Sequence, residues 1–243
     1  MARWYFLIVS KRLVYSVSVL VCCLVLLVLF GNDPFAIFAL ALLPSEVTYD
    51  IMLDAGHGGI DPGAVSKNDL YEKHYVLDIV LQMEQILSGQ GLKVGLTRRQ
   101  DQDVSHLVDK GTRHRRDLLG RYKLMNQAAL GISVHANSTK DPSVSGALVF
   151  YLKDKYLAEI YAKMVFDELE RVQVMNVNHP VPRTTLLLLK AGPPVLLVEI
   201  GFMTNSTDLA KLEDPQFRSN VAQALSAGII KFVNWGSGEQ SEP

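Results

Sequence analysis

The sequence predicts a single α/β domain whose mostly parallel, roughly six-stranded sheet is flanked by helices and preceded by an N-terminal transmembrane helix. Two observations support this fold class. From Tyr49 onward, short runs rich in Val, Ile and Leu alternate with longer segments whose apolar residues recur at helical spacing. Before Tyr49, one nearly unbroken apolar stretch is about as long as a helix that crosses a bilayer.

That apolar stretch, residues 13–30, is interpreted as a membrane anchor. Arg3, Lys11 and Arg12 precede it and Asp33 follows it, so the positive-inside rule predicts a cytoplasmic N-terminus and a membrane-anchored domain on the extracytoplasmic face. A cleaved signal peptide, which would give a secreted form, is the alternative. The stretch is long for a signal sequence, however, and no small-residue cleavage site follows it directly.

The chain then divides into three regions. Residues 1–46 hold the cytoplasmic stub, the anchor and a juxtamembrane segment, residues 47–235 form the globular domain, and residues 236–243 are a polar, flexible tail. The two cysteines, Cys22 and Cys23, both lie in the apolar stretch, so the globular domain has no disulfide and depends on core burial.

The elements of the globular domain are assigned from apolar periodicity. The helix at 72–87, for example, places Val76, Ile79 and Met83 on one face. Strands are predicted at 50–55, 92–97, 131–135, 146–152, 185–189 and 195–200, and further helices at 113–129, 156–172 and 215–233.

The charge balance argues against nucleic acid as a partner. The formal net charge is −1, whereas a general nucleic-acid binder needs an excess of Lys and Arg over a whole face. The arginine-rich run at residues 113–121 is local and is interpreted as the solvated face of a helix.

Two of the six histidines lie where an open parallel sheet binds ligands, at the carboxyl ends of its strands. His57 follows the first predicted strand and His135 closes the third. A single histidine is most often a polar residue with an ordinary partner, but two at corresponding strand ends indicate a shared site.

A carboxylate would complete a hydrolytic zinc site of the two-histidine, one-glutamate kind, which leaves a coordination position for water. Glu72 is the candidate, because it lies in the first turn of its helix after a glycine-bearing loop at 58–63. The alternative is a carboxylate favoured there only by the helix dipole.

Glu199 is the one charged residue in the apolar strand PPVLLVEIGF. A buried carboxylate is costly unless it is paired, hydrogen-bonded or near a metal, so a role at the mouth of the strand is favoured over a structural one. Beside a zinc ion, Glu199 suits the transfer of a proton from water to a leaving amine.

Four motifs carry a family resemblance: LDAGHGGIDPGA, the glutamate of YEKHYVLDI, SVHAN and VEIGFMTN. In this order they resemble the zinc-dependent catalytic domain of the N-acetylmuramoyl-L-alanine amidases, the amidase-3 group. The resemblance implies that residues 47–235 form a zinc amidase domain. It also implies one zinc ion bound by His57, Glu72 and His135, with Glu199 as the catalytic residue.

The resemblance also implies two substrate contacts, Arg98 and Asn137. Each has an alternative: Arg98 as an ion-pair partner of Asp101 or Asp103, and Asn137 as a cap of its own loop.

The activity implied is hydrolysis of the peptidoglycan amide bond between N-acetylmuramic acid and L-alanine. An anchor followed by a bare catalytic domain looks most like the germination-specific amidases of the spore cortex. No helical insert that could plug the site follows the histidine strand, which leaves control to other factors, an activator protein among them. The alternatives are a zinc peptidase acting on the stem peptide and a non-catalytic wall-binding module.

Overall fold

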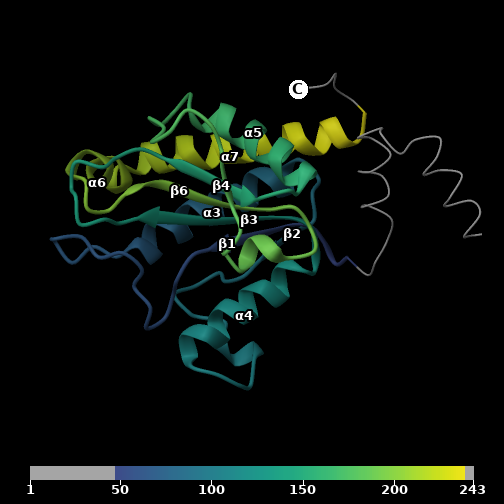
Figure 1. Cartoon of the computed structure of the whole chain (residues 1–243), viewed down its shortest axis with the longest axis horizontal. Helices are drawn as coiled ribbons and strands as arrows, with labels where there is room; N and C mark the ends of the chain where they lie inside the picture. Colours follow the sequence, from purple (N-terminus) through teal and green to yellow (C-terminus); the bar gives the residue numbers. More distant parts are fainter. Residues whose placement is uncertain (1–46, 239–243) are drawn as a thin grey trace, which may run out of the picture. The chain divides into compact units, whose positions relative to one another are not determined.

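The computed structural model describes residues 47–238, which contain one six-stranded sheet with helices packed on it (Figure 1). The order across the sheet is β2-β1-β3-β6-β4-β5. The predicted single α/β domain with a six-stranded sheet is confirmed. In chain order the strands are β1 (Tyr49–Ala55), β2 (Val94–Leu96), β3 (Ala128–Asn137), β4 (Leu148–Leu152), β5 (Val181–Arg183) and β6 (Val195–Phe202).

The sheet is mostly parallel, as the sequence predicts. β2, β1, β3 and β6 are neighbours and run in one direction. β4 pairs antiparallel with β6, and β5 pairs parallel with β4, so these two strands run against the rest. The carboxyl ends of β1, β3 and β6 therefore lie at one edge, where loops of α/β proteins form ligand sites.

Helices cover both faces of the sheet. α3 and α5 both pack against α7, whereas α4 packs against β3 and β1 (Figure 1). In Figure 1 the sheet lies between α4 on one side and α5 and α7 on the other. Among residues 47–238 the α-helices are α3 (Glu72–Gly89), α4 (Arg113–Met125), α5 (Tyr156–Leu169), α6 (Ser206–Glu213) and α7 (Pro215–Gly236), with short 3₁₀ helices η1 (Ser105–Leu107) and η2 (Leu188–Lys190).

The start of α3 is tied to the loop that precedes it. Its N-cap residue, Tyr71, makes no side-chain capping hydrogen bond. The loop supplies the missing acceptors: the backbone N–H of Glu72 donates to the Ala64 carbonyl at 3.0 Å, and that of Lys73 donates to the Pro62 carbonyl at 3.2 Å. Glu72 is thus fixed by the loop as well as by its helix.

Along each strand, the core side chains point alternately to the two faces of the sheet. On the α4 side, Met52 and Val195 pack with Met125 of α4 and with Leu189 of η2. Because successive strand residues point to opposite faces, Ile51 and its equivalents in β3 and β6 face the layer of α3, α5 and α7.

Three details of the predicted elements are wrong. The predicted strand at 185–189 is absent: β5 lies earlier, and Leu188 and Leu189 enter the core from η2, since a short apolar run does not by itself distinguish strand from helix. The predicted helix at 113–129 ends at Met125. Ala128 begins β3, because pairing with Tyr49 of β1 overrides the helix propensity of alanine.

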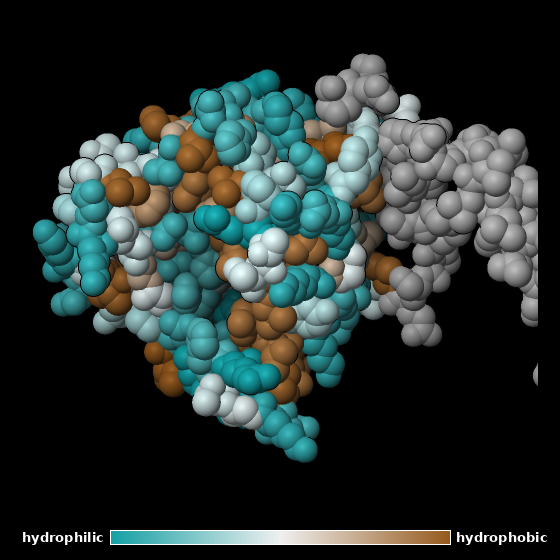
Figure 2. Space-filling model, in the orientation of Figure 1, coloured by the Kyte–Doolittle hydropathy of each residue, from teal (hydrophilic) through white to brown (hydrophobic). Residues whose placement is uncertain are grey.

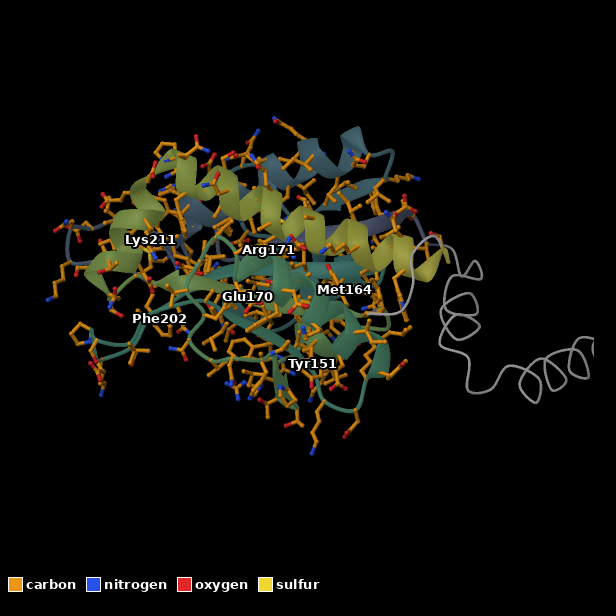
Figure 3. All side chains as sticks on the ribbon, turned by 90° about the horizontal axis from the view of Figure 1, so that it is seen from above. Tyr151, Met164, Glu170, Arg171, Phe202 and Lys211 are labelled. Carbon is orange, nitrogen blue, oxygen red and sulfur yellow. The ribbon has the colours of Figure 1, made fainter. Side chains whose placement is uncertain are left out.

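The third detail is α6, which periodicity did not reveal because it is only 8 residues long. The Asn205 side chain caps it, accepting hydrogen bonds from the N–H groups of Thr207 and Asp208. Figure 3 shows Lys211 of α6 and Phe202 of β6 at the same end of the domain, consistent with the packing of the two elements.

The predicted membrane anchor at 13–30 and the rest of residues 1–46 lie outside the described residues. Among the helices within 47–238, none combines the length and apolar character needed to span a bilayer. The predicted tail is described only in part: α7 reaches Gly236, and residues 239–243 are outside the described part of the chain.

Candidate active site

The three predicted metal ligands come together at the carboxyl edge of the sheet. His57 lies two residues beyond β1, Glu72 opens α3, and His135 lies near the end of β3. One ligand atom from each, an imidazole nitrogen or a carboxylate oxygen, lies within 4.8 Å of the others. Two imidazoles and one carboxylate at this spacing fit a zinc ion and leave one tetrahedral position for water.

The Glu72 carboxylate is the centre of this cluster. Its Oε1 lies 3.0 Å from His135 Nδ1 and accepts a hydrogen bond from the Ala136 N–H, and its Oε2 lies 3.2 Å from His57 Nε2 and accepts one from the Ala64 N–H. Burial alone raises the pKa of Glu72, but the two histidines outweigh it and hold the pKa far below its ordinary value. The carboxylate is therefore ionised and fixed in place, as a metal ligand must be.

Asp61 orients the first histidine, a role that sequence reasoning missed. The His57 Nδ1–H lies 3.0 Å from Asp61 Oδ2, which leaves Nε2 for the cluster. Burial lowers the pKa of His57, but the hydrogen bonds and charges of Glu72 and Asp61 raise it to about 9. In zinc sites, a carboxylate commonly accepts a hydrogen bond from the second nitrogen of a metal-binding imidazole. The position of Asp61, four residues after His57, was the sequence feature that could have indicated this role.

Two glycines let the backbone approach the cluster. A Cβ on Gly56 would lie 2.3 Å from Cε1 of the His135 ring. Gly63 has φ +72°, and a Cβ there would lie 2.5 Å from Glu72 Oε2. Any side chain at either position would displace a predicted ligand.

Glu199 lies beside the cluster without belonging to it. It pairs in register with His135 on the adjacent strand, which puts both side chains on the α4 face of the sheet. Its Oε2 is buried and has no hydrogen-bond partner within residues 47–238. Burial raises the pKa of Glu199 to about 7 and the Glu72 charge adds to this, while His135 and His57 oppose it. A carboxyl group in this state can both accept and donate a proton near neutral pH.

The two predicted substrate contacts have other partners in the structure. Arg98 is buried, and its guanidinium donates to the backbone carbonyls of Ala55, Gly56, Lys73 and Gln100. The acidic residues offered as its alternative partners bond elsewhere, Asp101 to Lys73 and Asp103 to Arg113.

Asn137 is half-buried, and its Oδ1 accepts a hydrogen bond from the Ser138 N–H at 2.8 Å. This bond matches the loop-capping alternative. The substrate contacts stay predictions.

A buried ion-pair network beneath the site was also missed by sequence reasoning. Asp54 accepts hydrogen bonds from Arg121, Thr97 and Ser133 and is fully buried. Burial raises the pKa of Asp54, but Arg121 and the other partners lower it to about 2. The sequence offered one signal for it, since Asp54 is a carboxylate that directly follows the apolar run Ile-Met-Leu of β1.

Fold and site together define a class: an α/β domain in which two histidines and one glutamate could hold a metal ion, with a separate carboxyl group beside them. The family follows from comparison. Residues 51–231 match the model of the N-acetylmuramoyl-L-alanine amidase family, Amidase_3. The chain belongs to this family.

Among curated proteins, the chain is 35% identical over 188 residues to the germination-specific N-acetylmuramoyl-L-alanine amidase of Bacillus subtilis, a match that covers 75% of this chain and 78% of the relative. It is 28% identical to the amidase AmiA of Salmonella typhimurium, with 76% of each chain covered. Among solved structures, the CwlD amidase of Clostridioides difficile in complex with the GerS lipoprotein is 34% identical, with a TM-score of 0.70, and the match covers 76% of this chain and 98% of that one.

Proposed function

We propose that this chain is a zinc-dependent amidase that hydrolyses the peptidoglycan amide bond between N-acetylmuramic acid and L-alanine. Membership of the amidase family supports the choice of the bond that is cleaved. The cluster of His57, Glu72 and His135 supports the dependence on a metal ion. One observation carries the mechanism: Glu199 is the neighbour of His135 in register on the adjacent strand, and its Oε2 is buried without a hydrogen-bond partner within residues 47–238.

In this proposal the three ligand residues hold one zinc ion, which would lower the pKa of a water molecule and polarise the scissile carbonyl. Glu199 accepts a proton as the water attacks. It then donates that proton to the nitrogen of L-alanine as the carbon–nitrogen bond breaks. The products are the free carboxylate of muramic acid and a stem peptide with a free amino group.

The surrounding residues fix these groups before substrate arrives. Asp61 sets the orientation of His57, and two backbone N–H groups hold the Glu72 carboxylate. Fixed ligands need little reorganisation during the reaction, which is the main electrostatic advantage of a preformed site.

The proposal extends to the spore cortex, since a 35% identical relative is a germination-specific amidase. The initial rate on purified cortex peptidoglycan should exceed the rate on vegetative peptidoglycan. Equal rates would leave the amidase activity in place and remove the cortex preference.

Location and control are proposed on separate grounds. The apolar residues 13–30 with their flanking charges support a membrane anchor and a domain outside the cytoplasm. The solved complex of a 34% identical amidase with a lipoprotein supports an activator protein as a partner. Membrane fractionation of cells that express the full chain tests the first, and co-purification from spore-forming cells tests the second.

The central experiment is digestion of purified peptidoglycan by the full-length chain in mild detergent, with and without a chelator. We expect release of stem peptides with a free L-alanine amino group, loss of this activity with chelator, and recovery on addition of zinc. His135→Ala should be inactive. The matched control is His179→Ala, which removes an exposed histidine whose ring nitrogen contacts the carbonyl of the neighbouring Pro180.

The products separate the competing functions. New amino groups on residues other than L-alanine would identify a stem-peptide peptidase. Zinc binding with no cleavage of any peptidoglycan would favour a wall-binding module, and activity that survives complete zinc removal would exclude the metal mechanism.

A further inference from the structure

Two buried guanidinium groups lie beneath the loop that carries His57. Both arginines are almost fully buried, and both point their donors at the backbone of this loop. Together they bond to three consecutive carbonyl groups, those of Ala55, Gly56 and His57. The two residues are Arg98, which follows β2, and Arg121 of α4.

Arg98 connects the elements that carry two of the proposed ligands. A single nitrogen, Nη2, donates to the Gly56 carbonyl and to the Lys73 carbonyl, each at 2.8 Å. Gly56 directly precedes His57, and Lys73 directly follows Glu72. The planar guanidinium therefore sets the separation between the His57 loop and the first turn of α3.

Arg121 connects the same loop to the strand of the third ligand. Its Nη2 donates to the His57 carbonyl, and its Nη1 donates to Asp54 at 2.5 Å. The other oxygen of Asp54 accepts a hydrogen bond from Ser133 at 2.6 Å, two residues before His135 on β3. The path from loop to strand is thus a continuous chain of charge-assisted hydrogen bonds.

The loop needs such support because of its backbone conformation. His57 has φ +60°, a left-handed conformation that is strained for a non-glycine residue and persists only where the surroundings enforce it. Carbonyl groups that turn inward also need donors, since a buried carbonyl without one is costly. The arginines meet both needs at the residue that presents an imidazole to the cluster.

We propose that Arg98 and Arg121 are positioning residues that brace the three ligand-bearing elements into one preorganised metal site. This inference rests on the proposed function, because it assumes that His57, Glu72 and His135 bind a metal ion. Neither arginine needs to touch substrate. Their effect passes through the geometry of the ligands, so their loss should weaken metal binding beyond any general loss of stability.

The test is the zinc dissociation constant of the purified full chain, measured by competition with a chromophoric chelator in the absence of substrate. Arg98→Lys and Arg121→Lys keep the positive charge but cannot bridge two carbonyls with a planar fork. We expect zinc affinity to fall by about 10–100-fold, as for other residues that orient metal ligands. With Co²⁺ in place of zinc, the visible absorption bands should also shift.

Arg218→Lys is the matched control. Arg218 also pairs with a carboxylate, Asp78, and donates to two backbone carbonyls, those of Leu212 and Glu213. Asp78 lies on α3, six residues after Glu72, and none of these three partners is a proposed metal ligand or the neighbour of one. This variant should lose stability and keep wild-type zinc affinity. If the arginine variants do not fold, Ser133→Ala tests the brace in their place, because it removes one hydroxyl group from the hydrogen-bond chain and leaves every charge in place. It should weaken zinc binding several-fold.

The outcomes separate the brace from the proposed function. Wild-type zinc affinity and an unchanged Co²⁺ spectrum in the Arg98, Arg121 and Ser133 variants would overturn the brace, as would equal losses in the Arg218 control. A wild-type chain that binds no zinc would instead overturn the metal site on which both proposals depend.

Discussion

The two faces of the central sheet bury different kinds of residue. Toward α3, α5 and α7, the central strands β1, β3 and β6 bury apolar side chains, such as Leu53 and Val134. Toward α4, the same strands begin apolar and become polar at their carboxyl ends, with Asp54, Ser133 and Glu199. Because strand side chains alternate between faces, one strand supplies a stable core on one side and site residues on the other.

The comparison shows that the two faces of the sheet place different demands on their side chains. The apolar face needs only well-packed volume, whereas an ionised group buried on the polar face is stable only where it is paired, as Asp54 is with Arg121. On the face of the molecule in Figure 2, hydrophobic and hydrophilic residues are mixed. Mutations on the two faces should therefore have separable consequences.

The largest effect is expected from the polar face, for Glu199→Gln. Glutamine cannot accept the proton, so kcat/KM should fall by about 10²–10⁴-fold while zinc affinity and Tm stay close to wild type. Peptidoglycan digestion and chelator competition measure the two quantities. Glu168→Gln is the control on the other face, where it breaks an ion pair with Lys231; it should change stability and leave kcat/KM intact. Full activity in Glu199→Gln would refute its proton-transfer role.

The next effect belongs to the apolar face. Ile79→Ala in α3 removes a fully buried side chain and should lower the free energy of unfolding by about 2–5 kcal/mol, measured by urea denaturation. Zinc affinity should not change, because the side chain lies away from the cluster. The exposed Gln85 of the same helix is the control, and Gln85→Ala should stay within about 0.5 kcal/mol. A loss of zinc affinity in Ile79→Ala would show that the two faces are coupled.

The smallest effect is a pH dependence of stability from the polar face. The pKa of Asp54 is about 2 in the folded chain against an ordinary 3.8, so its stabilisation is complete above pH 3.8 and is lost as pH falls through 2. The shift corresponds to about 2 kcal/mol. Urea denaturation of wild type and Asp54→Asn between pH 6 and pH 2 should show two curves that converge toward low pH. A constant separation between them would mean that folding does not shift the pKa of Asp54.

The sequence predicted the central strands and the long helices, because each has a clear period and sufficient length. β1, β3 and β6 and the helices α3, α5 and α7 were expected near their observed positions. The short elements at the far edge were not, since β5 has three residues and α6 has eight, too few for a period to emerge.

The site was predicted in part. His57, Glu72, His135 and Glu199 stand out in sequence because each is polar at a strand end, in an apolar strand or in a first helical turn. Asp61 and Arg121 were not found, because their roles depend on partners that only folding supplies: the imidazole four residues away in one case, and carbonyls 64 and 66 residues away in the other.

By itself, the sequence determined the fold class, the family motifs and the identity of the side chains available for chemistry, since these depend on local pattern and composition. Only the tertiary structure decided how those side chains meet. Arg98 illustrates the difference: its sequence position allowed a substrate contact or an ion pair, and the folded chain directs its donors to four backbone carbonyls. The physical reason is that hydrogen-bond partners are fixed by strand register and loop conformation, neither of which is written in the local pattern of residues.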